Sequence, residues 1–374
     1  MSINYDDIMA AVYKAVGEND DVRGVTRWLS TGFLPLDQAV SGLQSGGGLP
    51  SGRLIEIAGP PSAGKTALAT QVMIAAQRQG GVAAFHDHER SFDAKLAERL
   101  GLEMSPSRLI FRRPRTLEDS ILSFMNTARA IRSAKAFKDI PLVWVFDSIA
   151  SMVPQSQLEK EITKQGMNDQ SALARALSLH LKVLAVLAEE LDVCLVFLNQ
   201  TRMKLGIAFG DPTTTAGGDA SKFYFSVRIM LSASRITKGV GEDQEIVGFQ
   251  VTGRTIKNKV NRPFLKAKWH FMFREDGSGY FDTAGSLIDT LVARGVLSAV
   301  KNTGRIEWVD GSKPYRTELI EKINAAPNGI ALLEKLLIKS GVVEEVDEEA
   351  AKNAMLAAAA SAEAEGTNNE TPVT

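Results

Sequence analysis

The segment GPPSAGKT, residues 59 to 66, decides which fold this sequence predicts. It fits the pattern G-x-x-x-x-G-K-[ST], with the strand-like run RLIEIA before it and a helical stretch after it. Glycines in such a turn let the backbone wrap around phosphates, and the free amides of the helix N-terminus stabilise negative charge. The residues predicted to bind the phosphates of a nucleotide are Gly59, Pro60, Pro61, Ser62, Ala63, Gly64, Lys65 and Thr66.

Two side chains of this motif have specific predicted roles. Lys65 would reach the β- and γ-phosphates, and Thr66 would hold Mg²⁺ through its hydroxyl. The metal also needs a carboxylate on a neighbouring strand. LVWVFDS supplies Asp147 at the C-terminal end of an apolar run, where ligands sit in open parallel sheets. Thr66 and Asp147 are therefore the predicted metal ligands.

Strand-like and helical segments alternate outward from the motif, between about residues 30 and 275. The expected strands are 53–59, 81–87, 109–113, 142–147 and 193–199, and the expected helices are 66–79, 94–101, 116–135 and 171–191. Because these strands are almost continuously apolar, they predict a mostly parallel sheet covered by helices, which is an α/β fold.

A second strand end, in AAFHDHERSFD, supplies a candidate for water activation. Glu89 could polarise an attacking water molecule. From the residues alone, an equally good interpretation is that Asp87 and Glu89 solvate a loop and cap the next helix. His86 and His88 lie two residues apart, and a zinc site would need more ligands than these.

The stretch FLNQTRMKLGIAFGDPTTTAGGDASKFY, residues 197 to 224, begins like a buried strand and then breaks into a long loop rich in Thr and Gly. Loops above about 12–15 residues without structure of their own are uncommon in compact domains and are usually functional or disordered. Asn199 and Gln200 end the apolar run. An amide there could sense a γ-phosphate and pass the signal to the loop.

The composition, 44% hydrophobic and 23% charged over 374 residues, is that of an ordinary globular protein with a large core. No apolar run is long enough for a membrane span, and the acidic N-terminus argues against a secretion signal. The single cysteine, Cys194, lies in an apolar run as a small core side chain. Because no intrachain disulfide is possible, a cytoplasmic location is expected.

Charge is distributed unevenly along the chain. From Glu344 onward there are eight acidic residues and one Lys, and the remainder carries 42 basic and 36 acidic residues. A basic body with an acidic tail is typical of nucleic-acid binders, although a merely solubilising tail is an equal alternative. The expected divisions are an N-terminal helical segment at 1–30, a core at 31–280, a small domain at 281–343 and a disordered tail at 344–374.

Several segments together, in order and at similar spacing, carry a family resemblance. They are LSTGFLPLDQAV, GGGLPSGRLIEIAGPPSAGKT, FHDHERSFD, LVWVFDSIASMVP, the 197–224 stretch and TIKNKVNRPF. Over roughly residues 27–275 the sequence resembles the RecA family of DNA strand-exchange proteins. The resemblance implies a RecA-type P-loop NTPase core with an N-terminal polymerisation helix and a small C-terminal α+β domain. It also implies ATP and Mg²⁺ as cofactors, a helical filament on single-stranded DNA, and pairing with homologous double-stranded DNA in recombination and repair.

The resemblance also assigns expected roles at the active site. Glu89 matches the catalytic glutamate, and Gln200 matches the residue that couples the γ-phosphate to DNA binding. Lys257 and Lys259 match a pair that reaches ATP bound between neighbouring subunits, where cations stabilise transition-state charge as an arginine finger does. With Lys65, these are the expected catalytic residues.

By the same resemblance, residues 201–218 are one DNA-binding loop and residues 155–171 another. Cations can meet phosphates, Leu205 and Phe209 could pack against bases, and glycines let backbone amides approach a phosphate. The expected DNA-binding residues are Arg175, Lys182, Arg202, Met203, Lys204, Leu205, Phe209, Gly217 and Gly218.

The sequence departs from the family pattern in two places. Leu96 stands where the family commonly has an aromatic that stacks on adenine, so that Phe92 and Asp93 are the expected substitutes. In the secondary DNA site, Arg254 matches one basic residue and Thr252 replaces another. Capture of the duplex is therefore less secure than binding of the single strand.

Two other function classes stay open at this point. A hexameric helicase shares this core, but helicases of that kind usually carry an arginine finger and an N-terminal assembly domain, and neither is recognisable here. A low-turnover scaffold that coats DNA would not need the intact set of Lys65, Thr66, Glu89 and Asp147.

Overall fold

The computed structural model describes residues 24–159, 172–203, 213–239, 241 and 244–341. It also describes five residues of the N-terminal segment, which are all helical: Asp6, Met9, Ala10, Tyr13 and Lys14. The predicted 155–171 loop beyond Glu159, residues 204–212 of the second loop, and the acidic tail lie outside the described residues.

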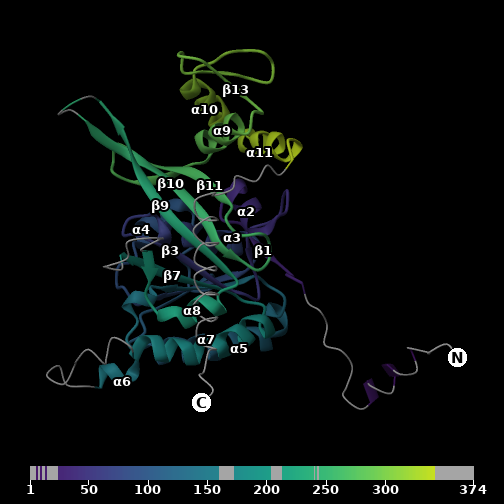
Figure 1. The fold of residues 1–374 in the computed structure, drawn as a ribbon, viewed down its shortest axis with the longest axis vertical. Helices are drawn as coiled ribbons and strands as arrows, with labels where there is room; N and C mark the ends of the chain where they lie inside the picture. The colour runs from purple at the N-terminus through teal and green to yellow at the C-terminus, as the bar shows by residue number, and fades with distance from the viewer. Residues whose placement is uncertain are drawn as a thin grey trace, which may run out of the picture.

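One large sheet runs through the molecule, with the strand order β12-β11-β10-β9-β3-β7-β6-β4-β5 (Figure 1). The parallel part comprises β9 (Val227–Lys238), β3 (Leu54–Gly59), β7 (Cys194–Met203), β6 (Leu142–Asp147), β4 (Val82–Asp87) and β5 (Leu109–Arg112). The other edge is antiparallel and comprises β10 (Glu245–Asn258), β11 (Lys266–Phe273) and β12 (Gly279–Asp282). The predicted α/β fold with a mostly parallel sheet is confirmed, and the antiparallel edge is an addition to that prediction.

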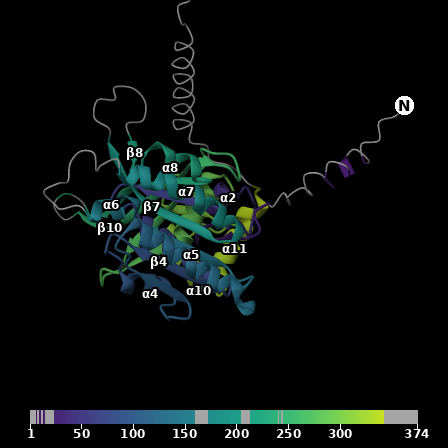
Figure 2. The same cartoon turned by 90° about the horizontal axis from the view of Figure 1, so that it is seen from below.

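Helices cover the sheet, and its strands supply two apolar cores (Figures 1 and 2). The covering helices are α2 (Leu34–Ser41), α3 (Lys65–Arg78), α4 (Ala94–Leu100), α5 (Leu117–Ser133) and α7 (Ala172–Glu190). In β6, Val145 belongs to the core that contains α3, whereas Phe146 belongs to the core that contains α5 and α7. This division follows from the alternation of side chains along a strand. None of the helices in the described part of the chain is long and apolar enough to cross a bilayer.

Short polar side chains start two of these helices where the sequence predicted them to start. The carboxylate of Asp93 accepts a hydrogen bond from the amide of Leu96 at 2.9 Å, and the hydroxyl of Thr116 accepts one from the amide of Asp119 at 3.1 Å. Each bond satisfies a helical amide that has no partner within the helix.

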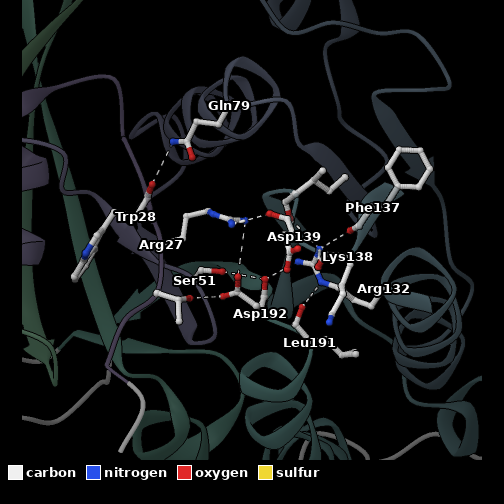
Figure 3. A network of polar contacts seen from close by, with 12 residues as sticks. Arg27, Trp28, Ser51, Gln79, Arg132, Phe137, Lys138, Asp139, Leu191 and Asp192 are labelled. Atoms are coloured by element: carbon white, nitrogen blue, oxygen red, sulfur yellow. Dashed lines mark hydrogen bonds and ion pairs between the residues drawn. The ribbon is translucent and has the colours of Figure 1, made fainter. Parts of the chain in front are cut away.

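A polar network joins the N-terminal ends of the parallel strands, at the edge of the sheet opposite the GPPSAGKT turn (Figure 3). Arg132 donates to the carbonyl oxygens of Leu191 at 2.6 Å and Asp192 at 2.9 Å, directly before β7. Arg27, directly before β1 (Trp28–Leu29), donates to the carbonyl of Asp139 at 2.7 Å, close to the start of β6. The network therefore ties β1, which pairs with β2 (Leu49–Pro50) in a separate two-stranded sheet, to the starts of β6 and β7.

The 197–224 stretch is more structured than the sequence suggested. β7 continues to Met203 and pairs with β8 (Thr213–Thr215), with Arg202 opposite Thr214. A short helix, α8 (Gly218–Tyr224), then begins. The prediction of an unstructured loop over 201–218 is therefore wrong at both ends, because the run of β-branched threonines extends the strand pairing.

The segment after β12 folds into α9 (Thr283–Ala293), the hairpin β13 (Ser298–Val300) and β14 (Arg305–Glu307), α10 (Arg316–Ala325) and α11 (Gly329–Lys339). Arg316 donates two hydrogen bonds, of 2.7 and 2.9 Å, to the carboxylate of Asp289, and these bonds join α10 to α9. Leu287 and Ile288 of α9 lie in the same apolar core as β11. The small C-terminal unit thus shares part of its core with the sheet, and the predicted boundary at 281 stays a prediction.

Candidate active site

The GPPSAGKT turn connects the end of β3 to the start of α3. Gly64 has a φ of 86°, which favours glycine, and Ser62 adopts a φ of 60°. A Cβ at Gly59 would lie 2.7 Å from the carbonyl oxygen of Leu231, so the close approach of β9 also requires glycine there. The turn is thus shaped by positions at which a side chain is strained or excluded.

The ammonium of Lys65 lies over this turn. It donates to the carbonyl oxygens of Gly59 at 3.1 Å and Pro60 at 2.8 Å. Burial lowers the pKa of Lys65, while the neighbouring carboxylates of Asp147 and Glu89 act in the opposite direction. The cation is held where it can contact a phosphate wrapped by the turn.

Thr66 and Asp147, the two residues expected from the sequence to bind the metal, are in direct contact. The hydroxyl of Thr66 donates to the carboxylate of Asp147 at 3.0 Å. Burial raises the pKa of Asp147 to about 6; the Thr66 hydrogen bond lowers it, and Glu89 and Asp87 raise it. A hydroxyl and a carboxylate are hard oxygen ligands that suit Mg²⁺, which usually takes only one or two protein ligands and completes its shell with phosphates and water.

Glu89 is held beside this pair by the backbone. The amides of His88 and Glu89 donate to the carbonyl of Asp147 at 2.6 and 3.0 Å. The side-chain amide of Gln200, which lies in β7 opposite Gly59 at the end of β3, is 3.3 Å from the Glu89 carboxylate. The carboxyl ends of β3, β4, β6 and β7 therefore bring together Lys65, Thr66, Glu89, Asp147 and Gln200.

Asp87 does not solvate a loop, which was one interpretation of its sequence. Its side chain is buried, lies 3.3 Å from Nε of Arg113 and accepts a hydrogen bond from the amide of Ser91. Asp87 therefore supports the turn that carries Glu89.

Two buried histidines lie behind the same turn. His86 Nδ1 and His88 Nε2 lie 2.7 and 3.0 Å from the hydroxyl of Ser120. Burial lowers the pKa of His86 to about 3 and that of His88 to about 4. Both rings are neutral at pH 7 and support the turn from inside the core. In the described parts of the chain, no three His, Cys, Asp or Glu side chains cluster as a metal site would require.

A cavity of about 540 Å³ opens beside the turn, which is large enough for a nucleotide. Its apolar wall is formed by Leu96, Phe249, Val251, Phe271 and Phe273. The sequence interpretation missed the three phenylalanines, because they lie on the antiparallel strands β10 and β11. Alternating apolar residues in those strands were the only signal that could have indicated them.

Phe92 and Asp93, the two residues expected to contact adenine, do not line this cavity. Phe92 packs against Phe85 and Phe111, with ring centroids 4.5 and 5.3 Å apart, and does not line the cavity. Asp93 caps α4 through the amide of Leu96. The apolar wall on β10 and β11 offers an aromatic surface for a base in their place.

Lys257 and Lys259 lie outside this cavity. The ammonium of Lys257 donates to the carbonyl oxygens of Lys222 at 2.6 Å and Phe223 at 2.9 Å, at the end of α8. Burial, followed by the nearby charges of Lys259 and Arg228, lowers its pKa to about 8. Within one subunit these lysines do not reach the site.

The expected DNA-binding residues are placed as follows. Arg175 and Lys182 are exposed on α7, and Arg202 is exposed near the end of β7. Gly217 and Gly218, with φ of 98° and 75°, form the turn into α8. Met203 ends β7, whereas Lys204, Leu205 and Phe209 lie outside the described residues.

One comparison with known proteins bears on this site. The family model for the RecA N-terminal domain matches residues 10–278, a span that contains the turn, the strand-end acids and both lysines.

Proposed function

The chain belongs to the RecA family of P-loop ATPases, and on that premise we propose that it is a DNA-dependent ATPase that forms a helical filament on single-stranded DNA. In this proposal the filament pairs its strand with homologous double-stranded DNA and exchanges strands, in recombination and repair in the cytoplasm. The observation that carries the proposal is the contact between Gln200 and Glu89. It joins a group suited to activate water to the strand that leads into the proposed DNA-binding loop.

The proposed reaction is transfer of the γ-phosphoryl group of ATP to water. The amides of the GPPSAGKT turn and Lys65 bind the phosphates, and Thr66 with Asp147 would hold Mg²⁺, which supplies charge neutralisation when bound. Glu89 accepts the proton of the attacking water as the new oxygen–phosphorus bond forms, while the bond between the γ-phosphorus and the bridging oxygen breaks and ADP leaves. The apolar wall on β10 and β11, with Phe249, Phe271 and Phe273, binds the base.

Lys257 and Lys259 would act on the ATP of a neighbouring subunit, because they lie outside their own cavity. Their charge would then be present at the transition state only in an assembled filament. Hydrolysis would therefore depend on polymerisation.

An exposed apolar surface supports assembly with a second copy. On α7, Leu179, Val183 and Val186 are 66%, 48% and 56% exposed at helical spacing. α8 packs against α7, and its Phe223 is 72% exposed beside the carbonyl that holds Lys257. Because Phe223 lies beside Lys257, its side chain is suited to contact the same neighbour whose ATP Lys257 would reach.

The test is steady-state ATP hydrolysis with and without single-stranded DNA, at two protein concentrations. Strong stimulation by DNA, rising steeply with protein concentration, is expected for a site completed between subunits. A rate indifferent to both would contradict the proposal. Electron micrographs add a second criterion, since closed hexameric rings with directional unwinding would favour a helicase.

A further inference from the structure

Strands β3, β7 and β9 carry a buried polar cluster that the proposed hydrolysis does not use. Glu56 and Asn199 are completely buried, and Arg228 is 9% exposed. A buried charge is costly unless it is paired and hydrogen-bonded, so each contact in such a cluster has a strong effect on the geometry.

The side chain of Asn199 makes three hydrogen bonds in this cluster. Its side-chain amide donates to Glu56 Oε1 at 2.8 Å and to the carbonyl of Ala216 at 2.9 Å. Its side-chain oxygen accepts from the amide of Gln200 at 2.9 Å. Because two partners are acceptors and one is a donor, only one orientation of the amide satisfies all three.

Arg228 completes the cluster from β9. Its Nε donates to Glu56 Oε2 at 2.5 Å, and its Nη2 reaches the hydroxyl of Thr215 at 3.3 Å. Glu56 thus holds Asn199 with one oxygen and Arg228 with the other. Thr215, at the end of β8, and Ala216, directly after it, are both linked to this one carboxylate, through Arg228 and Asn199 respectively.

The same cluster reaches the active site through Gln200, whose backbone amide bonds Asn199 and whose side chain lies 3.3 Å from Glu89. A shift of β8 would move the carbonyl of Ala216, and Asn199 could keep its bonds only by moving with it. The backbone of Gln200 would then move as well.

We propose that Asn199, oriented by the Glu56–Arg228 pair, is a positioning residue. It couples β8, the strand that follows residues 204–212, to Gln200 and Glu89. This inference rests on the proposed function and extends it, because it assigns the coupling between DNA and nucleotide to a specific buried cluster. Coupling between two ligands is reciprocal, so a nucleotide must tighten DNA binding by the same factor by which DNA tightens nucleotide binding.

The experiment measures that coupling directly, without turnover. Affinity for fluorescently labelled oligo(dT) is measured by anisotropy with and without a non-hydrolysable ATP analogue and Mg²⁺, for the wild type, Asn199→Ala and Glu56→Gln. For the wild type we expect the analogue to tighten DNA binding by roughly 5–150-fold, the usual range of coupling. For both variants we expect the analogue to change DNA affinity by less than about twofold.

Two further variants make the result specific. Thr215→Val removes only the contact to Arg228 and preserves shape; it is expected to reduce the coupling partly even if the larger changes impair folding. Gln77→Met is the matched control, because Gln77 is also buried and bonds the carbonyls of Glu103 and Arg108 far along the chain from this cluster. It should keep wild-type coupling.

The outcomes separate the inference from the function on which it rests. Coupling in the wild type and in Asn199→Ala, Glu56→Gln and Thr215→Val alike would overturn the inference and leave the function standing. Loss of coupling in Gln77→Met as well would show a general structural effect and would also overturn it. Absence of coupling in the wild type would overturn the proposed function itself.

Discussion

The ammonium of Lys257 lies 2.9 Å from the carbonyl oxygen of Phe223, at the end of α8 and outside the cavity that Glu89 lines. If Lys257 acts on a neighbour, Lys257→Ala should lower DNA-stimulated ATP hydrolysis by roughly 10³-fold, the lower range for an interfacial cation. Binding of ATP to the isolated subunit should persist, because Lys257 does not line the cavity.

Mixing subunits tests this assignment. A Lys257→Ala subunit still supplies Glu89, and a Glu89→Gln subunit still supplies Lys257, so a mixture should recover part of the activity that each lacks alone. A mixture as inactive as its components would show that both residues act within one subunit.

Glu89→Gln should lower turnover by roughly 10²–10⁴-fold, since it removes the proposed general base. Affinity for ATP should change little, because the phosphates are bound by the turn and Lys65. Single-turnover hydrolysis and fluorescent-nucleotide binding measure the two effects separately. Unchanged turnover would mean that another group activates the water.

Phe223→Ser should weaken self-association, because a side chain that is 72% exposed in the free subunit would be buried in the filament. Burial of a phenylalanine contributes about 1.5–3 kcal/mol, which corresponds to roughly tenfold or more in affinity. Analytical ultracentrifugation checks this. Phe137→Ser is the control, since Phe137 is 49% exposed on a different element, and equal weakening by both would argue against a specific surface.

His86 and His88 should each lower stability as the pH drops below about 6.5, the ordinary pKa of histidine. Burial lowers the folded-state pKa of His86 to about 3 and of His88 to about 4, so below pH 6.5 the unfolded chain binds protons that the folded chain does not. Each histidine then contributes up to about 1.4 kcal/mol of destabilisation per pH unit until its folded pKa is reached.

Urea unfolding at pH 7 and at pH 5 measures this loss. Burial also raises the folded pKa of Asp37 to about 7 and of Asp147 to about 6, and these carboxyls offset part of the loss. The test is therefore the difference between two proteins: His86→Gln should lose less stability between pH 7 and pH 5 than the wild type. An equal pH dependence for both would contradict the neutral, buried state of this ring.

Deletion of residues 344–374 should tighten binding to single-stranded DNA, because it removes eight acidic residues from a chain whose remainder is net basic. Anisotropy titrations at low and high salt check this, since the gain should shrink as salt screens the tail. A tail of the same length with its acids replaced by amides should behave like the deletion. Equal affinity at low salt for all three proteins would count against the prediction.

Residue spacing was enough to predict five of the parallel strands and to nominate candidate residues for the centre of the site, whereas β9 was not predicted and the expected role of Glu89 came from the family resemblance. The GPPSAGKT turn joins adjacent elements, and Asp147, Glu89 and Gln200 each stand at or just after the end of an apolar run. Because parallel strands in an α/β sheet present their carboxyl ends at one edge, such residues lie along that edge, and those on neighbouring strands can meet. The contacts of Thr66 with Asp147 and of Gln200 with Glu89 show that they do.

The rest depended on pairings between distant segments. Phe249 and Phe271 wall the cavity because β10 and β11 pair antiparallel with those residues in register, and no local pattern encodes which strands become neighbours. The Glu56–Arg228 pair likewise exists because β3 lies beside β9 with these two residues opposite each other. A charged residue in an apolar strand is costly until its partner is known, and only the folded sheet supplies that partner.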